Sequence, residues 1–376
     1  MKRKRHYRIA LFFGGRSPEH EVSLLSARNV IHALQEGGHT VLPVGIQKDG
    51  RWKLYDTAHA IFTHPDDPKK IALSDGGRDV VLLPFYAPKG LYLLEPPNTF
   101  LPVDVCFPLI HGTQGEDGTL QGLLEMTNLP YVGATVLGMA VTLDKVVMKE
   151  RFAHHRLATP RFISFTLADQ RRNAISYSEI TRTLGTPIFV KPASTGSSIG
   201  IHKVRTPDEF SAALEDAFRY DTKLLCEEAI PGREIECSVL GNLEPEASVA
   251  GEIIPRHEFY SYEAKYLDPN GADLVVPAAL SSAQMTEVQE LAKKAYVVCN
   301  MSGMGRVDFF IRRSDNRILL NEINGIPGFT NISMYPRLWA ASGLSYGDLL
   351  ERLIELAFER HALQAQVTKH YLSLKR

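Results

Sequence analysis

Residues 305–324 read Gly-Arg-Val-Asp-Phe-Phe-Ile-Arg-Arg-Ser-Asp-Asn-Arg-Ile-Leu-Leu-Asn-Glu-Ile-Asn, with two apolar runs on either side of a polar turn at Ser314-Asp315-Asn316. This pattern predicts a β-hairpin. Because side chains on a strand alternate between faces, Arg306 and Asp308 share one face of the first strand. The same alternation places four side chains of the second strand on a common face: Ile318, Leu320, Glu322 and Asn324.

A register symmetric about Asp315 pairs Asp308 with Glu322 and Arg306 with Asn324. Side chains in directly opposed positions lie roughly 5 Å apart, and like charges there are destabilising. Two carboxylates and an amide on one patch therefore predict a hard cation such as Mg²⁺, which usually bridges to substrate phosphates. The alternative is a solvated polar face on which Asp308 pairs with Arg306, and the hairpin alone favours neither.

The composition narrows the classes of partner. A length of 376 residues predicts two or three domains. The chain carries 42 Lys and Arg against 43 Asp and Glu. This balance argues against nucleic acid or a membrane as the main partner, and no apolar run approaches the roughly 20 residues that span a bilayer. The basic start at Met1–Arg8 lacks the apolar core of a signal peptide. The four cysteines lack Cys-x-x-Cys spacing, and we expect buried thiols in a reducing cytoplasm.

Strand and helix patterns alternate in the first third of the chain. An apolar run at 8–13 precedes a helical stripe at 24–34 and a second apolar run at 41–46. This order predicts a βαβ unit with parallel strands. A further strand is expected at 103–109. Residues 50–100 are rich in Pro, Gly and Asp, and their pattern does not indicate clear helices or strands.

A second unit begins near Asp144. Strands are expected at 188–191 and 223–227, and helices are expected after Thr206, after Ser281 and at 346–361. Ser281 and Gln284, like Thr206 and Glu209, have the spacing of a capping box, in which the two residues satisfy each other's backbone N–H groups.

Two loops of this unit could bind a nucleotide. The small residues of 194–200 follow Lys191 and would let backbone N–H groups approach phosphate oxygens. This is not a Walker A motif, because the lysine precedes the loop, and an ordinary flexible loop fits as well. Residues 226–234 end a strand in a turn that could contact adenine and ribose or could be a solvated acidic turn. Residues 260–266 could form a lid or an exposed loop.

Polar residues also follow the strands of the first unit. Glu19 and Ser23 lie where a strand meets a helix, and helix N-termini attract anionic groups. Glu19 could bind an amine and Ser23 a hydroxyl partner, with simple capping as the alternative. His111 follows a strand at the end where open α/β sheets bind ligands, although a structural histidine would fit there too.

In their order along the chain, these motifs resemble those of the D-alanine–D-alanine ligases of the ATP-grasp superfamily, almost end to end. The matching segments are Gly14–Ser23, His111–Gly118, Asp144-Lys145, Lys191–Gly200, Glu263–Tyr266, Gly305–Asp308, Asn321–Asn324 and Pro327–Thr330. The resemblance implies an α/β and α+β protein. Its parallel-sheet (pre-ATP-grasp) domain at 1–141 would precede a two-domain ATP-grasp fold at 142–234 and 235–376.

The resemblance further implies that ATP drives the ligation of two D-alanine molecules through a D-alanyl phosphate, for peptidoglycan synthesis. The implied cofactors are ATP and two Mg²⁺ ions, which Mn²⁺ could replace. A cytoplasmic homodimer is expected, with no nucleic-acid partner and no membrane insertion.

Roles for individual residues follow from the same resemblance. The residues that would bind the nucleotide are Lys145, Lys191 and Lys265, the flap residues Ser197 and Ser198, the adenine contacts Glu227, Glu228, Ala229 and Ile230, and Glu234 at the ribose. Asp308, Glu322 and Asn324 would hold the metal ions. The residues assigned to the substrates are Glu19, Ser23, His111, Ser333 and Met334, and the residues assigned to lid closure are Glu19, Ser197 and Tyr266. Arg306 and the Gly328 N–H would stabilise the oxyanion.

Two alternatives stay open. A D-alanine–D-serine or depsipeptide ligase shares most of these motifs, although the Glu263–Tyr266 segment favours the D-alanine dipeptide. A regulatory ATP-binding module would not need the complete metal and oxyanion set. Gly325 departs from the family pattern, which commonly has Thr or a similar residue after the metal-binding Asn, and this departure affects the shape of the second subsite.

Overall fold

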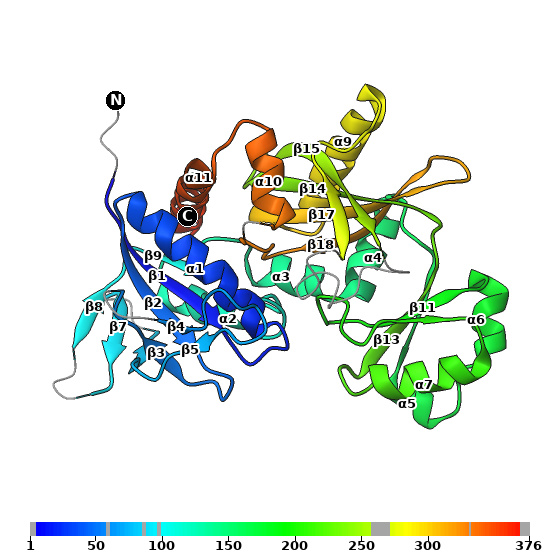
Figure 1. Cartoon of the computed structure of the whole chain (residues 1–376), viewed down its shortest axis with the longest axis horizontal. Helices are drawn as coiled ribbons and strands as arrows, with labels where there is room; N and C mark the ends of the chain where they lie inside the picture. The colour runs from blue at the N-terminus through cyan, green and yellow to red at the C-terminus, as the bar shows by residue number, and fades with distance from the viewer. Residues whose placement is uncertain are drawn as a thin grey trace, which may run out of the picture.

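The computed structural model describes residues 5–57, 61–84, 88–95, 99–256, 271–330 and 332–368. Three β-sheets of four or more strands follow one another along this part of the chain, each with its own helices (Figure 1). The first sheet forms the N-terminal lobe, the second a smaller lobe, and the third lies above and between them in that view. This combination of a parallel-containing sheet with antiparallel sheets is the expected fold class.

The N-terminal sheet has the strand order β8-β7-β6-β3-β2-β1-β9, and β1 pairs in parallel with both β2 and β9. In the central strand β1, the residues Ile9–Phe13 are all apolar and completely buried, as is typical of a parallel strand covered on both faces. The elements of this part are β1 (Arg8–Gly14), α1 (His20–Glu36), β2 (Thr40–Ile46), β3 (Trp52–Leu54), β4 (Phe62–Thr63), β5 (Ala72–Leu73), β6 (Arg78–Leu82), β7 (Gly90–Leu93), β8 (Phe100–Pro102), β9 (Val105–Pro108) and α2 (Thr119–Thr127).

The expected parallel arrangement accounts for three of the seven strands of this sheet, namely β2, β1 and β9. Strands β3, β6, β7 and β8 extend it in antiparallel fashion, and they come from the region at 50–100 whose pattern assigned no elements. Strands of three to five residues between turns are too short to show a clear alternation of apolar and polar side chains.

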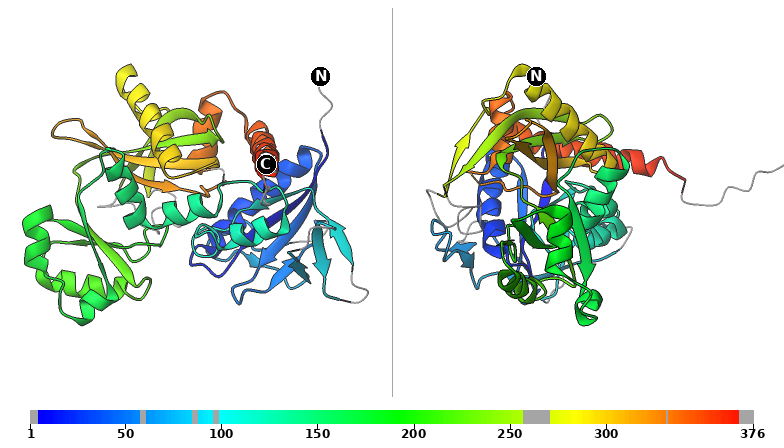
Figure 2. Two further views of the ribbon diagram at one scale, coloured as in Figure 1. Left: turned by 180° about the vertical axis from the view of Figure 1, so that it is seen from behind. Right: turned by 90° about the vertical axis from the view of Figure 1, so that its right-hand side faces the viewer.

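The second and third sheets are antiparallel, with the orders β10-β13-β11-β12 and β16-β15-β14-β17-β18 (Figure 2). The elements that precede or form the second sheet are α3 (Val136–Leu143), α4 (Lys145–His154), β10 (Phe162–Thr166), α5 (Leu167–Arg171), α6 (Tyr177–Leu184), β11 (Ile188–Pro192), β12 (His202–Val204), α7 (Pro207–Ala217) and β13 (Lys223–Glu228). Those of the third part are β14 (Gly232–Gly241), β15 (Glu246–Pro255), β16 (Ala272–Val275), α9 (Ser282–Val298), β17 (Gly303–Arg312), β18 (Ile318–Asn324), α10 (Met334–Ala341) and α11 (Tyr346–Ala365).

Helices α3 and α4 pack against β18, so the chain touches the third sheet before it builds the second. Strand β14 begins at Gly232, three residues before the expected boundary at 235. The division at 1–141, 142–234 and 235–376 remains a prediction.

One of the two expected capping boxes is present. Ser281 and Gln284 satisfy each other's backbone N–H groups at the start of α9. At the start of α7, Thr206 accepts the Glu209 N–H, but the Glu209 carboxylate accepts the N–H of Arg205 instead of that of the cap. The prediction of a second capping box was therefore wrong, because the Glu209 carboxylate binds the N–H of the residue before the cap.

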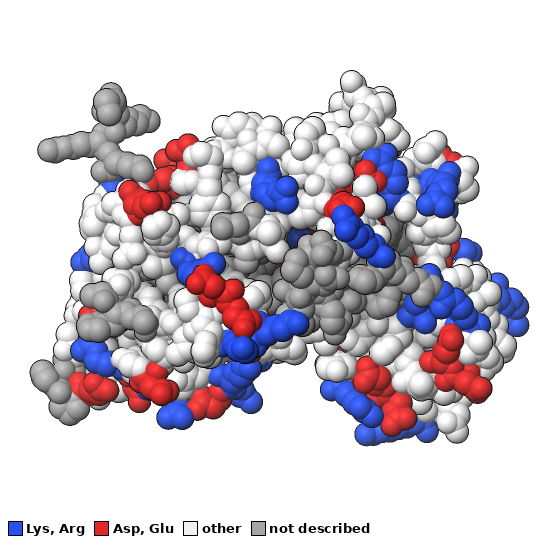
Figure 3. Space-filling view, in the orientation of Figure 1, with Lys and Arg blue, Asp and Glu red and all other residues white. Residues whose placement is uncertain are grey.

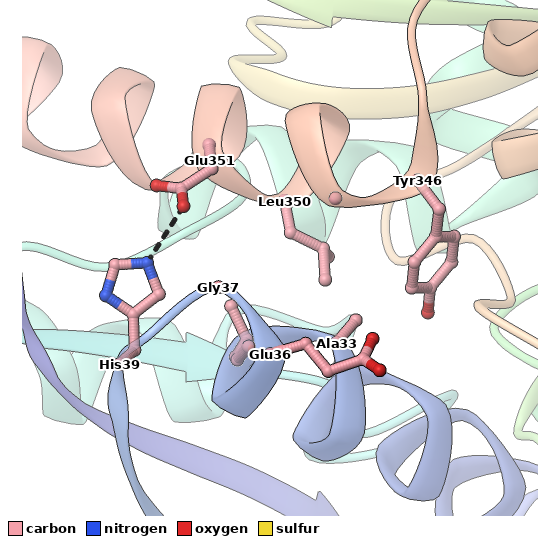
Figure 4. A pocket seen from close by; sticks show the side chains of 9 residues that line it. Ala33, Glu36, Gly37, His39, Tyr346, Leu350 and Glu351 are labelled. Atoms are coloured by element: carbon pink, nitrogen blue, oxygen red, sulfur yellow. Dashed lines mark hydrogen bonds and ion pairs between the residues drawn. The ribbon is translucent and has the colours of Figure 1, made fainter. Parts of the chain in front are cut away.

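The last helix, α11, packs on α1 and β9 of the N-terminal lobe (Figures 1 and 2). Near the end of α1, the two helices border a cavity of about 300 Å³, where His39 Nε2 lies 3.2 Å from the Glu351 carboxylate (Figure 4). The Tyr7 N–H donates to His39 Nδ1 at 3.2 Å, so Nε2 carries the proton that faces Glu351. This contact joins α11 to the segment between α1 and β2.

Acidic and basic side chains lie interspersed over the face shown in Figure 3, where a notch separates the N-terminal lobe from the lobe that carries α5–α7. None of the helices in the described part combines the length and apolarity that crossing a membrane requires. All four cysteines are buried and free, as expected.

Candidate active site

The hairpin of β17 and β18 has the predicted register where the polar residues lie. Arg306 is opposite Asn324, and Asp308 is opposite Glu322. The register then shifts by one residue, because Asn321 is an extra residue in β18 and Leu320 pairs with Phe309.

This β-bulge corrects one prediction. Ile318 and Leu320 do not share a face with Glu322 and Asn324, because an inserted residue reverses the alternation of faces. The two apolar side chains instead join the buried core together with Phe309 and Ile311. The bulge thus allows one strand to supply the core at its start and polar groups at its end.

Three carboxylates form a row across neighbouring strands: Glu236 on β14, Asp308 on β17 and Glu322 on β18. The Arg306 guanidinium compensates this charge. Its Nε and Nη2 donate to the two Asp308 oxygens at 2.8 and 2.7 Å, and its Nε lies 3.0 Å from Glu236. Asn324 Nδ2 donates to Asp308 at 2.9 Å. Glu236, which the sequence reading missed, is recognisable only from its strand pairing with Asp308.

The row has the chemistry of a site for a hard cation, since its donors are carboxylate and amide oxygens. In this structure both Asp308 oxygens are engaged by Arg306. Within the described residues, no three His, Cys, Asp or Glu side chains converge as a ready-made ion site. The Arg306–Asp308 pair of the alternative interpretation is therefore formed, and the metal role of the neighbouring Asp308, Glu322 and Asn324 stays a prediction.

Beside this row is a cavity of about 680 Å³ between the second and third sheets, a size typical of small-molecule sites. Its walls include most of the predicted nucleotide residues, namely Lys191, Ser198, Glu227, Glu228, Ala229, Ile230 and Glu234, together with Asp308 and Glu322. Lys145 Nζ donates to the Thr195 carbonyl at 2.5 Å and lies 3.8 Å from Glu322. The side chain of Glu228 is bound by the N–H and Nε of Arg161, both at 2.8 Å.

Glu19 meets the glycine-rich loop of the second sheet. The Ser197 hydroxyl donates to the buried Glu19 carboxylate, which joins two of the three residues predicted to close the site. A methyl group built on Gly112 or Gly196 would lie 2.4 or 2.7 Å from Glu19 Oε2, so both glycines are needed for this close packing.

The flap itself has an unusual backbone. Ser197 and Ser198 have φ values of 50° and 60°, in the left-handed region that non-glycine residues seldom adopt. Such strain is typical of sites where the surrounding structure fixes a loop for function. The third residue predicted for closure, Tyr266, lies outside the described residues, as does Lys265.

His111 is buried, and its contacts are with the backbone and a serine. Its Nδ1 donates to the Ile326 carbonyl at 2.9 Å, and its Nε2 lies 3.3 Å from Ser26 Oγ. Burial lowers the pKa of His111 to about 4, despite the bond to Ile326, so the ring is neutral near pH 7. The geometry shows how His111 fixes the loop that leads to Gly328.

Ser23 is completely buried and links two strand ends. Its hydroxyl accepts the Gly14 N–H at 2.8 Å and donates its proton to the Leu109 carbonyl at 2.6 Å. The serine at this junction therefore has a structural function in addition to any contact with substrate.

Glu116 is a partly buried residue that the sequence did not single out. It accepts the Gly112 N–H at 2.9 Å and the Ile326 N–H at 2.7 Å, and so joins the N-terminal lobe to the loop after β18. Burial, together with the nearby charge of Glu19, raises the pKa of Glu116 to about 7. Its only sequence signal is its place in the 111–118 motif.

We expect this pKa shift to appear in the pH dependence of stability. A carboxyl group whose pKa is raised from 4.5 to about 7 on folding stabilises the fold below pH 4.5, and this stabilisation is lost as the pH rises through 7. The loss amounts to roughly 3 kcal/mol in the free energy of unfolding. Urea unfolding at several pH values should show this decrease in the wild type and a flatter profile for Glu116→Gln. Equal slopes in the two proteins would contradict the assignment.

The predicted residues of the second subsite lie together at the start of α10. A methyl group on Gly328 would lie 2.6 Å from Ser333 Oγ, and this hydroxyl accepts the Thr330 N–H at 3.0 Å. The Met334 side chain packs in an apolar cluster with Ile253 and Leu338.

Gly325 now has a steric explanation. A methyl group there would lie 2.5 Å from the sulfur of Met139, a completely buried residue of α3. Met139 fills the space that a side chain at position 325 would need, and this explains why glycine fits there.

Comparisons with known proteins identify the same family over most of the chain. Family models described as D-ala D-ala ligase N-terminus and C-terminus match residues 8–134 and 152–355. A D-alanine–D-alanine ligase from Oceanobacillus iheyensis is 44% identical over 367 residues, which cover 98% of each chain.

Solved structures are similar as well. The D-alanine–D-alanine ligase from Coxiella burnetii has a TM-score of 0.82 at 38% identity, with 96% of each chain covered. The VanG D-Ala:D-Ser ligase from Enterococcus faecalis has a TM-score of 0.79 at 33% identity, covering 94% of this chain and all of that one. Fold and sequence similarity thus extend through all three sheets.

Proposed function

Because the chain belongs to the D-alanine–D-alanine ligase family, we propose that it joins two D-alanine molecules into D-alanyl-D-alanine at the expense of ATP, for peptidoglycan synthesis. The observation that carries this proposal is the combination of three features: the partly buried Glu19–Ser197 contact, the cavity between the two antiparallel sheets, and the row of carboxylates around Arg306. The D-alanine assignment is favoured over D-serine because the D-alanine–D-alanine ligase from Oceanobacillus iheyensis is 44% identical, against 33% for the VanG D-Ala:D-Ser ligase.

When bound, ATP would supply the phosphoryl group that activates the first carboxylate, and Mg²⁺ held by Asp308, Glu322 and Asn324 would neutralise phosphate charge. The protein's own residues would bind the substrates and stabilise the charges that develop. Lys145 and Lys191 offer positive charge to the phosphates, and Glu19 is placed to bind the ammonium group of the first D-alanine. Arg306 and the Gly328 N–H are suited to the oxyanion that forms when the second amine attacks. The flap that carries Ser197 would keep water from the activated intermediate.

The metal role assigned to Asp308, Glu322 and Asn324 gives a direct prediction. Asp308→Asn should raise the Mg²⁺ concentration needed for half-maximal activity by roughly 10-fold or more, because an amide is a weaker ligand than a carboxylate. The matched control is Asp315→Asn at the turn of the same hairpin, where the carboxylate pairs with Arg312 on the surface. Mg²⁺ titrations that coincide for wild type and Asp308→Asn would refute the metal role.

The experiment that tests the function is phosphate release from ATP with and without D-alanine, followed by product analysis with D-serine and D-lactate as competitors. We expect release that depends on D-alanine and a D-alanyl-D-alanine product. Release without D-alanine would favour a regulatory ATPase module, and a mixed dipeptide or depsipeptide would favour the alternative ligases. Light scattering and replacement of Mg²⁺ by Mn²⁺ test the homodimer and the metal preference that belong to the same proposal.

A further inference from the structure

Lys149 is a completely buried charge beside the nucleotide cavity. It lies on α4, and its Nζ is 2.6 Å from Glu227 Oε2 and donates to Thr159 Oγ1 at 2.9 Å. The other oxygen of the Glu227 carboxylate accepts from Lys191 Nζ at 2.6 Å. The side chains of Lys149 and Glu227 are only 1% and 2% exposed. Two lysines therefore share one carboxylate inside the protein.

The charges of this triad decide what Lys191 can offer a ligand. Two ammonium groups and one carboxylate leave a net charge of +1, whereas Lys191 and Glu227 alone would be neutral. Burial raises the pKa of Glu227, but the two ammonium groups outweigh burial and lower it overall, so the carboxylate stays ionised. Of the three residues of the triad, Lys191 and Glu227 border the cavity and Lys149 does not, so the net charge of the triad is presented there by Lys191.

We propose that Lys149 is a positioning residue of the nucleotide site, which neutralises Glu227 so that Lys191 keeps a net positive charge for the phosphates. This inference rests on the proposed use of ATP. It gives Lys149 a role although the residue does not border the cavity.

A second set of contacts links Lys149 to the strand that carries Glu322. Thr159 Oγ1, which accepts from Lys149, donates to the Leu320 carbonyl at 2.8 Å, and the Leu320 N–H donates to the Ala158 carbonyl at 2.8 Å. Leu320 is the residue next to the bulge in β18. Lys149 thus connects the phosphate-binding lysine with the strand segment that turns Glu322 towards the cavity.

The test separates phosphate recognition from general damage. Calorimetry on the full-length protein would measure the dissociation constants of ATP and adenosine for the wild type, Lys149→Met, Glu227→Gln and the double variant. The quantity compared is the preference for ATP over adenosine, because changes at the adenine affect both ligands alike. Lys149→Met should lower this preference roughly 10-fold, as expected for the loss of one nearby charge.

The double variant provides the rescue. Removing both Lys149 and the Glu227 charge leaves Lys191 with a net charge of +1, so the preference should return to within about 3-fold of the wild type. Lys293→Met is the control for loss of a lysine, since Lys293 pairs with Glu290 at the surface of α9. If Lys149→Met does not fold, the comparison of Glu227→Gln with the double variant measures the same 10-fold effect.

Equal weakening of ATP and adenosine by Lys149→Met, or no rescue in the double variant, would overturn the inference. Failure of the Lys149 inference is distinguishable from failure of the proposed ligase function. A wild type that prefers ATP but releases phosphate without D-alanine would refute the ligase reaction and leave the Lys149 inference to be decided by the variants. A wild type that shows no preference for ATP over adenosine would overturn both.

Discussion

Replacement of Arg306 by alanine is expected to lower kcat by roughly 10²- to 10³-fold while the affinity for ATP changes little, because one donor to the oxyanion is lost. The structure adds a second expectation. Arg306 neutralises the row formed by Glu236, Asp308 and Glu322, so its removal makes the row more negative. The Mg²⁺ concentration needed for half-maximal activity should therefore stay the same or fall. Steady-state kinetics over a Mg²⁺ titration measures both quantities.

Arg312→Ala is the matched control for this variant. Arg312 lies on the same strand and makes a similar two-point pair with Asp315, at 2.9 and 2.6 Å, but at the surface. It should leave kcat within about 2-fold of the wild type, as is usual for exposed ion pairs. Near-normal turnover in Arg306→Ala would sink the oxyanion assignment, and a strongly raised Mg²⁺ requirement would show that Arg306 supports the metal site instead.

The second large effect is expected at Gly112. In Gly112→Ala, the new methyl group would lie 2.4 Å from Glu19 Oε2, so the carboxylate must move away from its partner Ser197. A displacement of about 1 Å of a substrate-positioning group can cost roughly 10²-fold, and we expect a loss of that size in kcat/KM for D-alanine. ATP binding should be unaffected, because Gly112 belongs to the N-terminal lobe.

Gly38→Ala isolates the steric contribution. Gly112 and Gly38 both have a left-handed backbone, with φ of +70° and +87°, but a methyl group on Gly38 meets no atom within 4 Å. Both variants should lose roughly 1–2 kcal/mol of stability from the backbone alone. Only Gly112→Ala should lose activity, and an equal loss in the two variants would mean that the Glu19 contact is unimportant.

The sequence predicted those parts of the fold whose periodicity is strong. The long helices, the parallel pair of strands around β1 and the opposed pairs Arg306–Asn324 and Asp308–Glu322 all followed from apolar spacing and turn position. The bulge at Asn321 could not be predicted, because an extra residue in a strand leaves no mark on composition. The antiparallel extension of the first sheet was also missed, since its strands are too short for a pattern to emerge.

The candidate site shows a similar division. Residues at motif positions, such as Glu19, Lys191 and Asp308, could be selected from their order along the chain. Glu236 and Lys149 could not, because their significance comes from contacts across strands and helices that are distant in sequence. His111 illustrates an ambiguity that sequence cannot resolve: the motif indicates function, and the structure shows contacts with Ile326 and Ser26 that support the loop leading to Gly328.

The packing of α11 on α1 has a consequence for synthesis of the protein. The apolar residues of both helices belong to one continuous core, so the first lobe is incomplete until residues 346–365 have left the ribosome. At about 5–20 residues per second, roughly 10 to 50 seconds separate the synthesis of α2, the last of the other N-terminal elements, from that of α11. During translation, α1 would therefore present apolar surface that the mature protein hides, and a chain truncated before Ser345 would keep it exposed.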